Sequence, residues 1–258
     1  MSDRRQNTER SIGDRRPSVS AIPYREASCG KISCLLSEPE RMALARIASR
    51  VRFSRGAQIY LQGEPARAVY NISSGVVRTT RTAADGSRSV VAFLFPDDLF
   101  GLAAEGAYVN GAAAVTAVVA WRLPVSALEA LLRRDPTLEW HILVKLCHEL
   151  REAQQRALIL ARHRALVRLA MFVLMLARWQ EARNESDTEI YLPMTRSDIA
   201  DYLGLTLASV SRSFRVLQSR ELVRFNDRRH LQIVDRARLQ NIVTPDATTG
   251  RREEPPDQ

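Results

Sequence analysis

The chain has 258 residues, 45% of them hydrophobic and 26% charged, with a formal net charge of +9 at pH 7, which predicts about two domains with hydrophobic cores. The positive charge favours a polyanionic partner without identifying one, and three cysteines without a regular framework favour a reducing compartment over a disulfide-stabilised protein. The N-terminus lacks the apolar core of a signal peptide and the longest apolar run, residues 169–177, is too short to span a bilayer, so we expect a cytoplasmic protein with no membrane partner.

Residues 1–28 are polar, rich in arginine and without a hydrophobic period, so we expect a flexible basic arm. The next domain is expected over residues 29–135, and between residues 50 and 125 it has short runs of β-branched and aromatic residues, separated by glycines at intervals of roughly 7 to 15 residues. Asp85 and Gly86 together mark a hairpin turn. Short strands with regular turns predict a β-barrel or jelly roll for this region.

Residues 136–164 predict a long helix that ends in a hinge. After Leu138 no proline or glycine interrupts the chain up to residue 160, and apolar residues recur at steps of three and four, as in a coiled-coil seam. Because arginine and glutamate fill the other positions, we expect the helix to pair with a second copy of the chain; the alternative is a helix packed on its own β-domain. The seam residues are Leu143, Leu146, Leu150, Ala153, Ala157 and Leu160.

A second domain is expected over residues 165–243. It begins with a helix at residues 165–179 that is apolar on most faces, as a core helix should be. A polar loop is expected at residues 184–188. Beyond this domain, residues 244–258 are rich in proline, threonine and charge, which predicts a disordered tail.

Within this domain, residues 195–218 have the pattern of a helix-turn-helix. Thr195 can cap a first helix, with Asp198 near its positive end. Gly204 allows the positive φ of a sharp turn, and Thr206 can cap a second helix. Apolar residues at helical spacing predict the inward faces of both helices. They are Ile199, Ala200 and Leu203 in the first helix and Leu207, Val210, Phe214 and Leu217 in the second.

The second helix, at residues 206–218, should expose a short, polar and cationic face. Such a face can lie in the major groove of DNA, where arginine donates two hydrogen bonds to a guanine edge. An ordinary helical hairpin with a glycine turn is the alternative, and the cationic face counts against it. The exposed residues are expected to be Ala208, Ser209, Ser211, Arg212 and Arg215.

Two short strands after this helix, at residues 222–225 and 230–234, predict a wing. The turn between them carries Arg228 and Arg229, which are suited to phosphate contacts. Six arginines lie between residues 208 and 230, against one glutamate and one aspartate. This local excess of positive charge is where we expect the DNA footprint.

Two sets of motifs resemble the CRP/FNR family of bacterial regulators. Leu-Gly-Leu-Thr at residues 203–206, followed by Ser211 and Arg212, resembles its FNR/FixK branch. The resemblance covers residues 29–243 and implies an α+β chain with an N-terminal β-roll like a cyclic-nucleotide-binding jelly roll, a long dimerisation helix and a C-terminal winged helix-turn-helix. The stretches that look like the sensor β-roll are 61–65 (Leu-Gln-Gly-Glu-Pro), 70–75 (Tyr-Asn-Ile-Ser-Ser-Gly), 85–86 (Asp-Gly) and 95–101 (Phe-Pro-Asp-Asp-Leu-Phe-Gly).

The resemblance implies a homodimer whose two recognition helices lie roughly 34 Å apart and read a pseudo-palindrome with TTGA-type half-sites. Arg212 would bind a guanine, and Ser211 a neighbouring base. Thr206 and Ser209 would contact the DNA backbone. Phosphate charges would be neutralised by Arg215, Arg228 and Arg229.

One position departs from the family pattern, because the FNR and FixK recognition helix has glutamate where this chain has Ala208. Glutamate can accept a hydrogen bond from a cytosine amino group, so its loss should relax or change one base-pair preference by about 1–3 kcal/mol. The resemblance further implies RNA polymerase as the partner of an activator, and target genes of low-oxygen, redox or nitrogen metabolism.

The cyclic-nucleotide site of the family is not matched. Its members hold a phosphate with arginine and a ribose with glutamate just after the Phe-Gly turn. Here Leu102 and two alanines follow Gly101, and no charged residue lies between Glu105 and Arg122. A buried phosphate without a cation is unfavourable, so we expect no cAMP binding.

The cysteines do not form the iron–sulfur ligand set of FNR. Such a cluster needs four cysteine ligands, whereas the chain has three, and the missing one would fall near Trp121. Cys29 and Cys34 are weak candidates for a redox pair or for a metal or cluster site across the dimer; we favour two unrelated thiols. We therefore predict no cofactor and no metal.

An enzyme is not expected. A metal-dependent cupin needs histidine and carboxylate ligands on its strands, and no histidine precedes His141. No Ser/His/Asp set or phosphate loop of the expected form is found in the sequence. The alternative function is a β-roll small-molecule-binding regulatory module that acts through protein partners, and the recognition helix and wing count against it.

Overall fold

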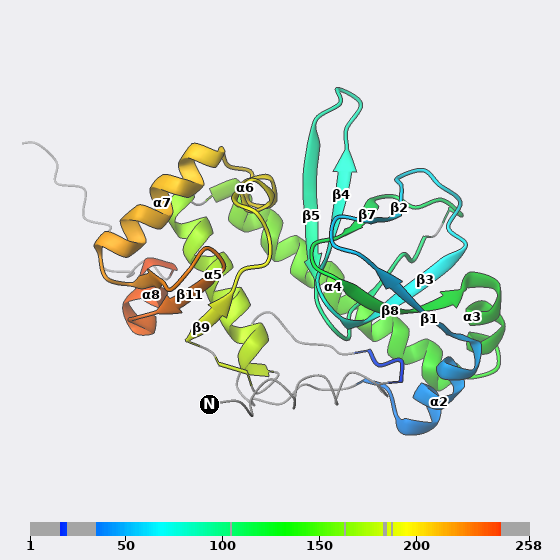
Figure 1. Cartoon of the computed structure of the whole chain (residues 1–258). Coiled ribbons are helices and arrows are strands. Elements are labelled where there is room, and N and C mark those ends of the chain that lie inside the picture. Colours follow the sequence, from blue (N-terminus) through cyan, green and yellow to red (C-terminus); the bar gives the residue numbers. More distant parts are fainter. Residues whose placement is uncertain are drawn as a thin grey trace, which may run out of the picture.

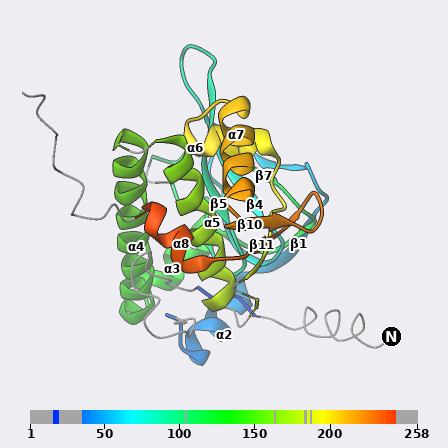
Figure 2. The ribbon, with the colours of Figure 1, turned by 90° about the vertical axis from the view of Figure 1, so that its left-hand side faces the viewer.

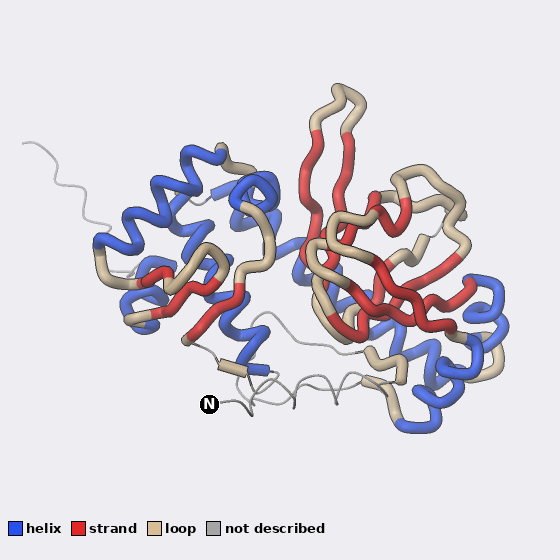
Figure 3. Tube along the Cα trace, in the orientation of Figure 1, coloured by secondary structure: helices blue, strands red, loops and turns tan. Residues whose placement is uncertain are grey.

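The computed structural model of the protein describes residues 16–19, 35–103, 105–162, 164–182, 185–186 and 188–243. Figure 1 shows a β-rich body and a helical body joined by one long helix. Figure 3 shows the same division, with strands in one body and mostly helices in the other. This is the α+β class that the sequence predicts.

The β-rich body consists of two four-stranded antiparallel sheets, with strand orders β1-β8-β3-β6 and β2-β7-β4-β5. The β4–β5 hairpin extends beyond the rest of this body (Figure 1), and Gly86 in its turn has a φ of 80°, as the Asp-Gly pair predicts. The predicted β-roll is confirmed. Its strands are β1 (Ser49–Phe53), β2 (Gln58–Tyr60), β3 (Ala68–Ser74), β4 (Val77–Thr82), β5 (Arg88–Leu94), β6 (Leu99–Phe100), β7 (Gly111–Ala114) and β8 (Val118–Pro124).

Strand β3 is covered on both faces, which explains its unbroken run of buried residues from Ala68 to Ile72. One face meets aromatic rings between the sheets, where Tyr60 stacks on Tyr108 with ring centroids 3.7 Å apart. The Tyr108 hydroxyl donates to the Ala68 carbonyl at 2.7 Å. Helices cover the other face. They are α2 (Glu38–Ile47), α3 (Val125–Leu132) and α4 (Pro136–Arg162).

A short N-terminal segment, residues 16–19, packs against the β-roll. Val19 is only 1% exposed and lies in a cluster with residues of α2, β8 and α4. The Ser18 backbone N–H donates to Asn71 Oδ1 at 2.9 Å, and the Asn71 amide donates back to the Ser18 carbonyl. The prediction of a flexible arm is wrong for these residues, because one valine among polar neighbours gives no periodic signal. The rest of the predicted arm lies outside the described residues.

Helix α4 runs from the β-roll to the second body and forms one edge of the molecule in Figure 2. It ends at Arg162, and α5 (Ala165–Ala182) begins after a break that includes the non-helical Arg164, where the sequence predicts a hinge. In the described ranges no helix is both long and apolar enough to cross a membrane.

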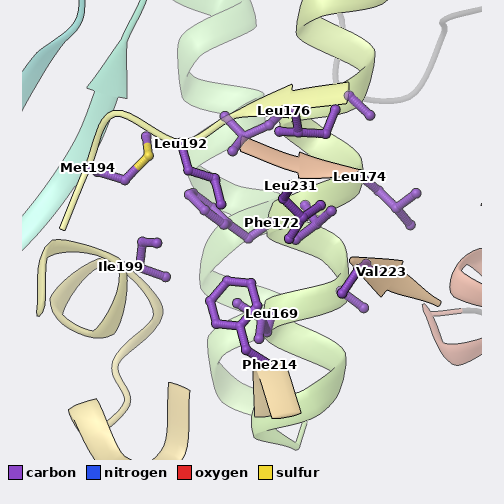
Figure 4. Packing of buried hydrophobic residues seen from close by; sticks show 14 of the residues in the cluster. Leu169, Phe172, Leu174, Leu176, Leu192, Met194, Ile199, Phe214, Val223 and Leu231 are labelled. Carbon is purple, nitrogen blue, oxygen red and sulfur yellow. The ribbon is translucent and has the colours of Figure 1, made fainter. Parts of the chain in front are cut away.

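Helix α5 forms the centre of the second body. Figure 4 shows its Leu169, Phe172 and Leu176 packed among side chains of the other elements, including Phe214 and Leu231. A three-stranded antiparallel sheet has the order β10-β11-β9. Strand β9 was not predicted, since three residues after a polar loop are too few to show alternation. The surrounding elements are β9 (Glu189–Tyr191), α6 (Arg196–Leu203), α7 (Leu207–Ser219), β10 (Val223–Phe225), β11 (His230–Ile233) and α8 (Arg236–Val243).

Candidate nucleic-acid interface

Helix α6 begins with a capping box, as the sequence predicts. Thr195 Oγ1 accepts from the Asp198 N–H at 3.0 Å, and Asp198 Oδ2 accepts from the Thr195 N–H at 3.1 Å. Gly204 ends the helix with a φ of 60°, in the left-handed region that favours glycine. Thr206 Oγ1 then accepts from the Ser209 N–H at 3.1 Å and caps α7. The predicted helix-turn-helix is confirmed.

The inward face of α7 begins later than predicted. Val210, Phe214 and Leu217 are at most 3% exposed, as expected. Leu207 is 53% exposed, so the prediction that it faces inward is wrong. It is the first residue of the helix, and burial on the inward face starts only at Val210, one turn further along.

The other face of α7 is open to solvent. Ala208, Arg212 and Arg215 are exposed, and helical geometry places residues spaced by four and three on one face. Ser209 and Ser211 are half-buried at its margins. Figures 1 and 2 show α7 on the outside of the second body, where this face is accessible to a large partner.

The wing follows directly after α7. Strands β10 and β11 pair in register, with Arg224 opposite Gln232. Asp227 shapes the turn, because its Oδ1 accepts from the Arg229 and His230 N–H groups at 2.6 and 2.8 Å. These hydrogen bonds lower the pKa of Asp227 to about 2, so the carboxylate stays ionised. The turn holds Arg228 exposed and Arg229 half-buried.

Sequence reasoning missed Arg196, the first residue of α6. Its guanidinium carbon lies 3.7 Å from the ring centroid of Phe214 in α7 and 4.5 Å from that of Phe225 in β10. Burial lowers its pKa to about 10, which leaves it a cation at neutral pH. The side chain therefore joins the first helix, the candidate recognition helix and the wing. No local pattern signals such a contact, because both rings come much later in the chain.

Comparison with known proteins agrees with this geometry. Two family models match, a cyclic nucleotide-binding domain over residues 50–135 and a Crp-like helix-turn-helix domain over residues 167–242. The nitrogen fixation regulation protein FixK of Azorhizobium caulinodans is 34% identical over 200 residues, covering 77% of this chain and 81% of the relative. FixK of Rhizobium meliloti is 33% identical, covering 74% of this chain and 85% of that relative. The chain belongs to the CRP/FNR family.

A solved structure supports the same placement within the CRP/FNR family. FixK2 from Bradyrhizobium japonicum matches with a TM-score of 0.72 and 32% identity, covering 78% of this chain and 100% of that chain. The protein therefore lies in the FixK-like branch of the family, as the sequence motifs indicate. It is a transcriptional regulator that binds DNA through its helix-turn-helix.

In this CRP/FNR protein the predicted dimer seam lies open along α4. Leu143, Leu146 and Leu150 are 49%, 38% and 60% exposed, and Ala153 and Ala157 are also exposed. The last seam residue, Leu160, is half-buried. Figure 2 shows α4 at the edge of the molecule, so this apolar stripe is accessible to a second copy. Trp140, 62% exposed on the same helix, adds to the apolar surface.

In the family, the effector site lies just after the Phe-Gly turn. Here the described residues directly after that turn, Leu102 and Ala103, are uncharged. Gly101 has a φ of 87°, and Leu102 after it is 38% exposed. Of the weak metal candidates, Cys29 and Cys34 both lie outside the described residues. Within the ranges that the structure does describe, no group of three His, Cys, Asp or Glu residues is placed to hold a metal ion.

Proposed function

We propose that this regulator acts as a homodimer that reads a pseudo-palindromic DNA site with TTGA-type half-sites. The observation that carries the proposal is the open face of α7, on which Arg212 lies between Ala208 and Arg215. From this position Arg212 donates two hydrogen bonds to a guanine, and Ser211 contacts a neighbouring base. Ala208 supplies no acceptor for a cytosine, so that base pair is read less strictly than in relatives with glutamate.

The remaining contacts hold the regulator on the DNA backbone. Thr206 and Ser209 lie at the N-terminal end of α7, where backbone N–H groups and the helix dipole favour phosphate. Arg215 flanks the groove, and the wing brings Arg228 and Arg229 to the next phosphates. These contacts carry charge rather than sequence information.

Replacing Arg228 by alanine should weaken binding to the palindrome and to a scrambled duplex by similar factors. The reason is that a phosphate contact contributes through counterion release, which is independent of sequence. The slope of log K against log salt should become shallower by about 0.9 for each half-site. Fluorescence anisotropy over a salt series measures both quantities. A selective loss of binding to the palindrome alone would contradict the role of Arg228.

The open seam on α4 supports dimerisation, and Leu150→Glu tests it. Glutamate at this position places like charges against each other across the pair and removes apolar burial. The dissociation constant of the dimer should rise at least about tenfold, or roughly 1.4 kcal/mol. Analytical ultracentrifugation measures it. Leu61→Glu is a matched control, because Leu61 is 54% exposed on the β-roll, away from α4; an equal effect of both variants would contradict the seam.

We further propose that neither cAMP nor an iron–sulfur cluster is needed for DNA binding. Support comes from the uncharged stretch after Glu105 and from the aromatic rings of Tyr60 and Tyr108, which stack between the sheets. Calorimetry should show no micromolar binding of cAMP. Anaerobic purification should give a colourless protein, and a brown, oxygen-labile one would contradict the proposal.

The biological setting rests on the relatives. Two of them are named nitrogen fixation regulation proteins, which supports target genes of nitrogen or low-oxygen metabolism. We propose that the bound regulator contacts RNA polymerase and acts in the cytoplasm. A non-enzymatic role fits these relatives.

The deciding experiment is fluorescence anisotropy at one fixed salt concentration, with a TTGA-type palindrome and a scrambled duplex of equal length. The protein is purified in air without added ligand. Strong preference for the palindrome is the expected result. Equal, salt-sensitive binding to both duplexes would contradict the proposed half-site.

A further inference from the structure

Three parts of the molecule meet at Arg156 of α4. Its Nη2 donates to the Val90 carbonyl of β5 at 2.7 Å and to the Tyr202 carbonyl of α6 at 3.0 Å. The guanidinium carbon also lies 4.0 Å from the ring centroid of Tyr202. One side chain thus connects the long helix, the β-roll and the first helix of the helix-turn-helix.

The partial burial of Arg156 indicates a role other than packing. Its Nε is buried and finds no hydrogen-bond partner in the described structure, and burial lowers the pKa of the guanidinium. Removing part of a cation from water without full hydrogen bonding costs free energy, which reduces what the contact contributes to stability. What the planar guanidinium adds is direction, because it stacks on the Tyr202 ring while its Nη2 holds two carbonyls of different domains relative to each other.

Helix α6 is in fact held against the β-roll at both of its ends. Near its N-terminus, Asp198 forms an ion pair with Arg78 of β4. Near its C-terminus lie the Arg156 contact and the ring of Phe93, whose centroid is 5.1 Å from that of Tyr202. Figure 1 shows α6 beside β5, in agreement with these contacts. Two points of attachment fix the direction of a helix, whereas one would leave it free to rotate.

The attachment point on α4 borders the seam. Arg156 lies between Ala153 and Ala157, both of which belong to the exposed stripe proposed to pair in the dimer. Helix α6 is joined to α7 by the turn at Gly204, by the stacking of Arg196 on Phe214 and by a shared hydrophobic core. A rotation of α6 about this point would therefore move the recognition helix relative to the dimer axis.

We infer that Arg156 is a positioning residue that sets the distance between the two recognition helices, and so the half-site spacing that the regulator accepts. In a dimeric helix-turn-helix protein this spacing follows directly from the separation of the two recognition helices. The inference rests on the proposed homodimeric function. Arg156 controls the spacing between half-sites that the regulator accepts, but not which bases are read within a half-site.

The test compares wild type with Arg156→Met on a series of palindromes whose central spacer differs by one or two base pairs. Wild type should prefer one spacing. The variant should lose at least about fivefold of that preference, or roughly 1 kcal/mol. Its preference for the correct bases within each half-site should be unchanged, which a general loss of stability would not produce. An unchanged spacing profile overturns the inference.

Further variants separate the explanations. Arg156→Lys keeps the charge but not the planar group that stacks on Tyr202, so it should also relax spacing; wild-type behaviour would overturn the role of the guanidinium plane. Arg151→Met is the matched control, since Arg151 is exposed on the same helix, and it should keep the wild-type profile. If Arg156→Met does not fold, Arg78→Met releases the other end of α6 and should relax spacing in the same way. A wild type without preference for any palindrome contradicts the proposed function itself.

Discussion

Replacing Arg212 by alanine should remove most of the preference for the palindrome over scrambled DNA. Arg212 is exposed on the open face of α7, one helical turn beyond Ala208. A bidentate contact with guanine contributes about 1–3 kcal/mol of discrimination, and a dimer makes this contact twice. Anisotropy titrations with both duplexes at one salt concentration measure the loss. Binding to scrambled DNA should fall much less.

Arg220→Ala is the control for Arg212→Ala. Arg220 is exposed at the C-terminal end of the same helix, so this variant removes the same charge away from the proposed groove-facing surface. The variant should weaken binding to both duplexes slightly and leave the ratio of the two affinities unchanged. If Arg212→Ala keeps the wild-type ratio, the main base-reading residue lies elsewhere.

Phe214→Ala should destabilise the DNA-binding body by about 3–5 kcal/mol, the usual cost of removing a buried aromatic ring. The ring is 3% exposed, packs edge-on to Phe225 at 5.2 Å and supports the Arg196 guanidinium. Such a loss is a large part of the stability of a small domain. Urea unfolding followed by circular dichroism measures it.

Leu207→Ala is the matched comparison on the same helix. Because Leu207 is 53% exposed, its truncation should lower the free energy of unfolding by no more than about 0.5 kcal/mol, as is usual for a surface position. The apolar period of the sequence alone places Leu207 and Phe214 on one inward face, and so predicts similar losses of stability for the two truncations. Equal destabilisation by the two variants would mean that Leu207 is buried in solution.

Local chemistry is what the sequence predicts well in this protein. Thr195, Gly204 and Thr206 each act on backbone groups within a few residues, so their roles can be inferred without the fold. The period of the α4 seam is equally local. Its exposure in a single chain is consistent with the predicted pairing.

Contacts between distant parts of the chain were not predictable in this way. Arg156 meets Val90 and Tyr202, which lie on opposite sides of it in the sequence and share no motif with it. Arg196 likewise stacks on rings contributed by α7 and the wing. Neither arginine interrupts a hydrophobic period, so both look like ordinary surface residues until the elements are assembled.

The burial of Val19 has a consequence for the order in which the chain folds. Its cluster includes residues of β8 and of the first turns of α4, which are synthesised much later than Val19 itself. The pocket for this valine therefore does not exist until most of the β-roll has left the ribosome, and we expect its docking to be a late folding step. Pulsed hydrogen exchange during refolding should show the Ser18 N–H protected after the amides of β3, and earlier protection would contradict this order.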